Sequence, residues 1–249
     1  MKTLIIGDIH GNFEALMKAL ENADYKDGDR LIVLGDYIDR GPQPREVLEF
    51  LLSLKNGSNI YLRGNHEELL IRALHGDTHA YDVLINNGFA DTLVDYGVDM
   101  NSLVYKQNRH YIKRDGSLIP LISTELALFL KKVFPKEHLE FIDGTKYMFE
   151  TDAFFYSHAG ALPYKQLIEQ SGTDYLWGMD DEFLKSRYNY GKTLVFGHYH
   201  MVKPLISRRK ICIGMDSGVR ILITDYSPMV LVDSEGGYEE VKEEWLAMK

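Results

Sequence analysis

Short apolar runs alternate with amphipathic stretches along the first quarter of the chain. Three runs, at residues 2–6, 30–34 and 59–63, are rich in the β-branched and bulky residues that suit buried strands. The stretches between them, at 12–22 and 44–55, predict helices, because the first carries apolar residues at three- and four-residue spacing and the second begins at a proline. This alternation predicts an α/β fold built on a parallel sheet with crossover helices.

The pattern changes after residue 67, where a long stretch predicts helices separated by loops that contain Gly and Asp. The helices expected there cover 67–75, 80–96 and 123–133. We therefore predict a single domain over residues 1–249 that carries a mostly helical insertion at 68–152. Strand-like alternation then returns and predicts a mostly antiparallel C-terminal half. The strands expected in that half lie at 146–149, 153–157, 193–196, 210–213, 221–224 and 229–232.

Composition and charge narrow the range of partners. Of the 249 residues 45% are hydrophobic, which is ample for a core, and the formal net charge of −9 argues against broad binding to nucleic acid or anionic membranes. The sequence has one cysteine, Cys212, so an intramolecular disulfide is excluded. The chain begins without a basic leader segment, and its apolar runs are far shorter than the roughly 20 residues of a membrane span. These features predict a soluble, cytoplasmic protein that binds neither nucleic acid nor membrane.

Side chains that can bind metal follow the three predicted parallel strands directly. Asp8 and His10 come after the first strand, Asp36 after the second and Asn65 after the third. Because the carboxyl ends of parallel strands face one crevice, we expect these residues to meet there. Asp8 and His10 can share one ion, Asp36 can bridge two ions, and Asn65 can offer a neutral carbonyl oxygen. Three more histidines follow apolar runs of the C-terminal half and are expected at the same rim: His158, His198 and His200.

The donor atoms of this set are oxygen and nitrogen, which together suit manganese, iron or zinc better than calcium. Two such ions, held about 3.5 to 4 Å apart, lower the pKa of a bridging water and neutralise phosphate oxygens during an in-line displacement. His66 is the candidate proton donor to the leaving group, and Asp39 is the partner expected to orient it. Arg40 is expected to bind the phosphate, the alternative being a surface salt bridge with Asp39. Arg63 is either a second phosphate ligand or a cap on its strand end.

Five motifs occur in order along the chain: Gly-Asp-X-His-Gly at 7–11, Gly-Asp-X-X-Asp-Arg-Gly at 35–41, Gly-Asn-His-Glu at 64–67, His-Ala-Gly at 158–160 and Gly-His at 197–198. With these motifs the chain resembles the phosphoprotein phosphatase family of calcineurin-like metallophosphoesterases, over about residues 1–68 and 153–224. The resemblance implies a two-sheet β-sandwich with flanking helices. It also implies a site for two divalent metal ions, with manganese as the first candidate and iron, zinc, nickel or cobalt as alternatives.

The resemblance assigns roles to individual residues. It implies that the first ion is bound by Asp8, His10 and Asp36, and the second by Asp36, Asn65, His158 and His198. It further implies that His66 is the general acid, assisted by Asp39, and that Arg40, Arg63 and Asn65 contact the substrate phosphate.

Two departures from the family pattern bear on the substrate. Many bacterial relatives carry a phosphate-binding arginine two residues after a tryptophan, where this chain has Met179 after Trp177, so Arg187 or a residue of the insertion is expected to replace it. The segment at 197–200 adds a second histidine, His200, which is more typical of the wider superfamily, where it joins the first metal. This ligand, together with an insertion long enough to cap the crevice, favours diesters, nucleotides or other small phosphoesters.

The leading functional expectation is a serine/threonine protein phosphatase-type phosphomonoesterase, with dual specificity as a variant, acting on phosphorylated peptides or proteins or on small phosphoesters. The alternative is a symmetrical bis(5'-nucleosyl)-tetraphosphatase or another nucleotide phosphohydrolase, because Gly-Pro-Gln at 41–43 and the segment 213–218 also resemble those enzymes. A third hypothesis, a catalytically weak regulatory module that binds metal or nucleotide, is motivated by Met179. The sequence makes no prediction of the oligomeric state.

Overall fold

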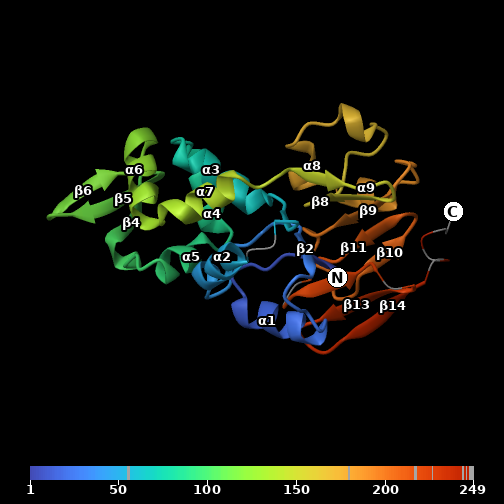
Figure 1. Ribbon diagram of the computed structural model, residues 1–249. Helices are drawn as coiled ribbons and strands as arrows, with labels where there is room; N and C mark the ends of the chain where they lie inside the picture. Colours follow the sequence, from blue (N-terminus) through green and yellow to red (C-terminus); the bar gives the residue numbers. More distant parts are fainter. Residues whose placement is uncertain are drawn as a thin grey trace.

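Two β-sheets packed face to face form the centre of the molecule, and helices cover their outer faces (Figure 1). The arrangement comes from a computed structural model that describes residues 1–54, 57–178, 180–215, 218–225, 227–242, 244 and 246. The predicted two-sheet sandwich with flanking helices is confirmed.

The six-stranded sheet joins the first strands of the chain to the last, in the order β14-β13-β12-β1-β2-β3. Its parallel half consists of β1 (Thr3–Ile6), β2 (Arg30–Val33) and β3 (Ile60–Tyr61), as the strand-helix alternation predicts. Its antiparallel half consists of β12 (Arg220–Ile223), β13 (Met229–Asp233) and β14 (Tyr238–Val241). The last strand, β14, has no counterpart among the predicted elements. The carboxyl ends of β1, β2 and β3 therefore lie side by side, as the expected site requires.

The five-stranded sheet has the order β10-β11-β9-β8-β7. Its strands are β7 (Met148–Glu150), β8 (Phe154–Ser157), β9 (Thr193–Phe196), β10 (Leu205–Ser207) and β11 (Lys210–Cys212). The expectation of mostly antiparallel strands is wrong for the centre of this sheet, because β8, β9 and β11 run parallel. The connection from β8 to β9, which contains η2 (Leu167–Glu169), α8 (Asp174–Trp177) and α9 (Asp180–Lys185), is long enough for such a crossover.

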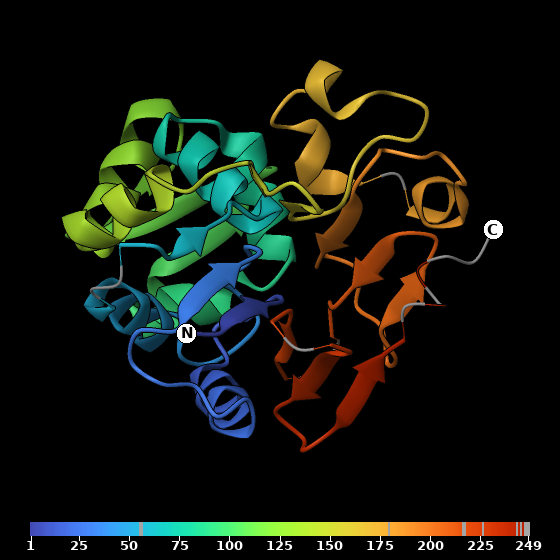
Figure 2. The same ribbon diagram turned by 45° about the vertical axis from the view of Figure 1, so that its right-hand side comes forward.

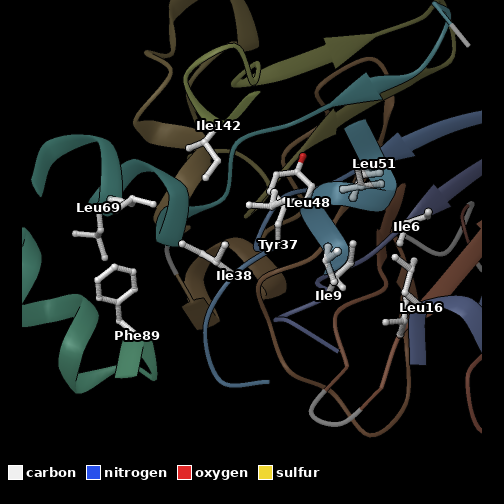
Figure 3. Close-up of a cluster of buried hydrophobic side chains, with 14 of the residues drawn as sticks. Ile6, Ile9, Leu16, Tyr37, Ile38, Leu48, Leu51, Leu69, Phe89 and Ile142 are labelled. Atoms are coloured by element: carbon white, nitrogen blue, oxygen red, sulfur yellow. The ribbon is translucent and has the colours of Figure 1, made fainter. Parts of the chain in front are cut away.

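Alternating side chains bury both faces of the six-stranded sheet. Ile5 faces the second sheet and packs with Val195 in the core between the sheets. Its neighbour Ile6 faces the opposite core, which α1 (Phe13–Asn22) and α2 (Pro44–Ser53) cover (Figure 3). A strand that is buried on both faces needs apolar residues at every position, which explains the continuous apolar runs in the sequence.

Helices make up most of the regular structure of the insertion, which also contains a separate three-stranded antiparallel sheet that was not expected, in the order β4-β5-β6. The insertion begins within α3 (Asn65–Leu74). It continues through α4 (Thr78–Asn86), α5 (Phe89–Asp95), η1 (Met100–Ser102), β4 (Leu103–Lys106), β5 (Arg109–Arg114), β6 (Ser117–Pro120), α6 (Ser123–Val133) and α7 (Lys136–Asp143). The predicted helix at 123–133 is confirmed, whereas the one expected at 80–96 is interrupted at Gly88, whose φ is 100°.

Two-residue turns join the three strands of this sheet, which the sequence reading missed. Gln107 and Asn108 have φ values of 52° and 55°, and Asp115 and Gly116 have values of 49° and 77°. Positive φ at both central residues is the geometry of tight hairpin turns, and Asp-Gly is a preferred pair for it.

The insertion, coloured green, and the C-terminal strands, coloured orange and red, lie on opposite sides of the N-terminal strands (Figure 2). None of the helices within the described part of the chain combines the length and the apolar character needed to cross a bilayer.

Candidate metal centre

The segments that follow five strands bring Asp and His side chains together. Those after β1, β2 and β3 contribute from the first sheet, and those after β8 and β9 contribute from the second. Three groups have ligand atoms that all lie within 4.8 Å of one another: Asp8, His10 and His200; His10, Asp36 and His66; and Asp36, His158 and His198. Because the groups share His10 and Asp36, they form one continuous cluster rather than separate sites.

Four acceptor atoms crowd together at one end of this cluster. The Nε2 atom of His158 lies 2.8 Å from Oδ1 of Asn65, 3.2 Å from Nδ1 of His198 and 3.4 Å from a carboxylate oxygen of Asp36. The Nδ1 atom of His198 also lies 3.2 Å from the same Asn65 oxygen. Lone pairs of neutral imidazole, amide and carboxylate groups repel one another unless a proton or a cation lies between them. This donor set fits a divalent cation of intermediate softness.

Backbone carbonyls fix the orientation of three of the histidine rings. The Nδ1 atoms of His10, His158 and His200 each lie 3.0 Å from a carbonyl oxygen, those of Ile38, Leu34 and Met215 respectively. A carbonyl can only accept, so each Nδ1 donates, and in the neutral ring each Nε2 carries a lone pair, which in His200 faces the guanidinium of Arg40. This pattern is typical of histidines that bind metal.

Burial and charge shift the pKa values of the side chains in the cluster. Burial lowers the pKa of His10 to about 3 and that of His198 to about 3, so both rings are neutral at pH 7. Burial alone would raise the pKa of Asp36, but His158 and His66 hold it well below its usual range. Burial raises the pKa of Asp8.

Two buried atoms of the cluster have no hydrogen-bond partner among the described residues, namely Oδ2 of Asp8 and Nε2 of His10. The other oxygen of Asp8 accepts from the backbone N–H of His198 at 3.0 Å. An unpaired buried acceptor is costly, and a bound cation would satisfy both atoms. The residues present therefore fit a metal at this position too.

A histidine–carboxylate pair lies at the edge of the cluster. The Nδ1 atom of His66 is 2.5 Å from Oδ2 of Asp39, and both residues are buried. Burial lowers the pKa of His66, but the charge of Asp36 and the hydrogen bond that His66 donates to Asp39 together raise it to about 9. The exposed guanidinium of Arg40 lies 3.4 Å from Nε2 of His66 and 2.6 Å from Nε2 of His200. The predicted acid, its partner and the predicted phosphate ligand are thus brought together.

The backbone is strained at this site. Five site residues have left-handed φ values, which non-glycine residues rarely adopt: His10 (46°), Asp36 (52°), Asp39 (73°), Arg40 (69°) and His198 (62°). Each such residue costs on the order of 1 to 3 kcal/mol and persists only where the surroundings hold it. The contacts that supply this constraint are therefore part of the site.

Glu67, which the sequence reading left without a role, supplies one such constraint. It is fully buried, and its carboxylate accepts hydrogen bonds from the backbone N–H groups of Gly64 at 3.0 Å, Asp36 at 2.8 Å and Tyr37 at 2.9 Å. Burial and the charge of Asp36 raise the pKa of Glu67 to about 7. The loops are so close here that a Cβ on Gly35 would lie 2.4 Å from the nitrogen of Gly64. The available sequence signal was an acid three residues after a glycine at a helix start.

Arg63 lies in a different environment from the one expected of a phosphate ligand. Its guanidinium donates to Glu68 at 3.1 Å, to Tyr147 at 3.1 Å and to the carbonyl of Asp143 at 2.7 Å, while Nε donates to Thr145 at 3.2 Å. It also lies 4.8 Å from the centroid of the Tyr147 ring. These partners hold α3 to the segment that leaves the insertion.

The position of the missing arginine, Met179, lies outside the described residues, as do Asp216 and Ser217 of the late motif. Arg187, its proposed substitute, is exposed and lines an open pocket with Lys185 and Tyr188. As far as the structure describes it, that pocket contains none of the clustered Asp and His residues.

The site combines buried carboxylates and neutral histidines with the His66–Asp39 pair and Arg40. This combination is typical of metal-dependent phosphoester hydrolases. Residues 1–202 match the model of the calcineurin-like phosphoesterase family, and the chain belongs to that family.

Curated relatives within the family include enzymes named symmetrical bis(5'-nucleosyl)-tetraphosphatase. This chain is 28% identical to the one from Marinomonas sp. over 196 residues, which cover 76% of this chain and 67% of that protein. It is 42% identical to the one from Psychromonas ingrahamii over 81 residues, which cover 32% of this chain and only 29% of that protein. A crystal structure provisionally described as a diadenosine tetraphosphatase has a TM-score of 0.61 over 93% of both chains at 16% identity, which shows the shared fold.

Proposed function

We propose that this protein hydrolyses dinucleoside polyphosphates and cuts one phosphoanhydride bond of a substrate such as diadenosine tetraphosphate. The observation that carries the hydrolase proposal is the meeting of the Asp and His cluster with the His66–Asp39 pair and Arg40. The names of the relatives that match three quarters of this chain support the dinucleotide alternative over the protein phosphatase expected first.

The residues present fit two divalent cations. We assign Asp8, His10, Asp36 and His200 to the first ion, and Asp36, Asn65, His158 and His198 to the second. When bound, the ions would supply a nucleophilic water and neutralise charge on the phosphate oxygens. Manganese is the first candidate for both positions, followed by iron, zinc, nickel or cobalt.

The chain itself supplies the proton and part of the phosphate binding. His66, kept protonated and oriented by Asp39, donates a proton from Nε2 to the oxygen of the leaving phosphate. Arg40 is exposed beside His66 and can donate two parallel hydrogen bonds to the phosphate that is attacked. The amide of Asn65 is the remaining candidate for a substrate contact. We assign Arg63 to the structure and not to the substrate, because its donors are already satisfied.

The test is a comparison of three substrates. The chelated protein is reconstituted with manganese and assayed with diadenosine tetraphosphate, a phosphopeptide panel and 4-nitrophenyl phosphate, with His66→Asn as the inactive control. We expect the highest kcat/KM with the dinucleotide and two molecules of ADP as the product.

Other outcomes of this comparison change the proposal in defined ways. A higher kcat/KM for the phosphopeptides would restore the protein phosphatase hypothesis. If no substrate is hydrolysed although two metal ions are bound, the protein is the regulatory module and the proposed function is wrong.

A further inference from the structure

One hydroxyl group of the insertion contacts the pair proposed to deliver the proton. Thr92 lies on α5, has no exposed surface, and donates its hydroxyl proton to Oδ1 of Asp39 at 2.7 Å. The same hydroxyl oxygen accepts the backbone N–H of Asp39 at 2.9 Å. The other carboxylate oxygen, Oδ2, receives Nδ1 of His66. Asp39 is therefore held between one side chain of the insertion and one of the core domain.

The neighbouring turn of the insertion holds the next residue in the same way. The carbonyl of Gly88 accepts the backbone N–H of Arg40 at 3.1 Å, and a Cβ on Gly88 would lie 2.8 Å from that nitrogen. Asp39 and Arg40 both have left-handed φ, of 73° and 69°, which requires outside contacts to persist. Within the described residues, their backbone N–H groups go to Thr92 and Gly88, so the insertion supplies these contacts.

The helix that carries Thr92 is itself firmly anchored. Phe89 and Leu93, on either side of it, are fully buried in the same core. The Phe89 ring packs against Tyr81 of α4, with centroids 6.0 Å apart, and stacks on Phe134, at 6.1 Å. An anchor of this kind lets a single hydroxyl impose a fixed position on its partner.

From these contacts we propose that Thr92 is a positioning residue for phosphoester hydrolysis, the outer member of a hydrogen-bonded chain Thr92–Asp39–His66. Its hydroxyl fixes the rotation of the Asp39 carboxylate so that Oδ2 faces Nδ1 of His66 and Nε2 faces the leaving oxygen. This is the logic by which a third group orients a catalytic pair. The inference rests on the proposed role of His66 as the acid, and it gives the insertion a part in catalysis.

The experiment is a double-mutant cycle with the manganese-loaded full chain and diadenosine tetraphosphate. Thr92→Val, which keeps the volume and removes the hydroxyl, is expected to lower kcat about tenfold or more with KM within twofold, since the lost bond is to a charged group. Thr92→Ser, which keeps the hydroxyl, should recover most of the activity. In an Asp39→Asn background Thr92→Val should have almost no further effect on kcat. If Thr92→Val does not fold, Thr92→Ala replaces it.

A matched control separates this effect from general damage to the insertion. Thr124 is exposed on α6 of the same insertion, and Thr124→Val should leave kcat unchanged. Metal content should equal that of the wild type in all variants. The inference is overturned if Thr92→Val keeps kcat within twofold, if serine does not rescue, or if the two substitutions multiply in the cycle.

A substrate-free measurement keeps this inference separate from the proposed function. The proton between His66 and Asp39 is expected to give a proton NMR signal far downfield of the amides, identified by its loss in His66→Asn. Thr92→Val should shift or abolish that signal and Thr92→Ser should preserve it, while an unmoved signal would contradict the role of Thr92. If the wild type does not hydrolyse the dinucleotide, the proposed function fails alone, and the NMR comparison still decides the inference.

Discussion

Replacing Arg63 distinguishes between two roles for this residue. One is the structural role that its contacts indicate, and the other is the phosphate-binding role that the family resemblance implies. In Arg63→Met the apolar stem over the Tyr147 ring is kept and the charge is lost. The guanidinium lies 3.1 Å from the Glu68 carboxylate, and the two side chains are only 9% and 13% exposed. At that distance and an effective dielectric constant of about 20, their attraction is about 5 kcal/mol before desolvation is subtracted.

Desolvation offsets much of that attraction, but the variant also leaves the Glu68 charge without its cation. Removing one partner of a buried pair typically costs about 3 to 5 kcal/mol, so we expect the free energy of unfolding to fall by about 3 kcal/mol. The carbonyl of Asp143 and the hydroxyl of Thr145 lose their donor in the same variant. The segment leaving the insertion should therefore detach from α3.

Urea unfolding at constant metal concentration measures the loss, and KM on the same preparations measures any substrate role. Arg45→Met is the matched control, because Arg45 forms an exposed pair with Glu49, each side chain being 51% exposed, and the urea midpoint should not change measurably. A loss of stability below about 1 kcal/mol together with a tenfold rise in KM would refute the structural role and return Arg63 to the substrate site.

Three further variants test the site itself. His66→Asn should lower kcat by about 10²-fold or more, because a general acid contributes that order of rate, while metal analysis should find both ions still bound; loss of metal would argue against the acid role. Asp36→Asn should weaken both metal sites together, since its carboxylate belongs to two of the three groups of the cluster, and full occupancy of both sites in that variant would show that Asp36 is not shared. Asp39→Asn should shift the high-pH limb of the kcat profile to lower pH. Asp36 and Asp39 raise the pKa of His66 to about 9, and His66 acts as an acid only when it is protonated. Without the charge of Asp39, His66 loses its proton at a lower pH. A pH profile from 6 to 10 that does not move would contradict this reading.

Local pattern was sufficient to predict the first half of the sandwich and most of the site. The strand-helix alternation is a property of neighbouring residues, so β1 to β3 and the helices between them could be recognised without knowing what they pack against. Because parallel strands end at one edge, the polar residues after them were expected to meet, and Asp8, Asp36 and Asn65 all lie beside His198. The Asp-Gly pair at 115–116 was also a local signal, because it is a preferred pair for the tight turn that joins β5 to β6 of the third sheet.

Only the tertiary structure decided what partners the remaining residues have. Arg63 meets Thr145 and Tyr147, and Asp39 meets Thr92, across 82, 84 and 53 residues of chain. Separations of this length carry no periodic signal, because they depend on how the insertion folds back onto the sheet. For the same reason the parallel centre of the second sheet could not be read from alternation, which specifies a buried strand but not the direction of its neighbour. The sequence thus determined which chemistry gathers at the strand ends, and the packing of the insertion decided which side chains hold that chemistry in place.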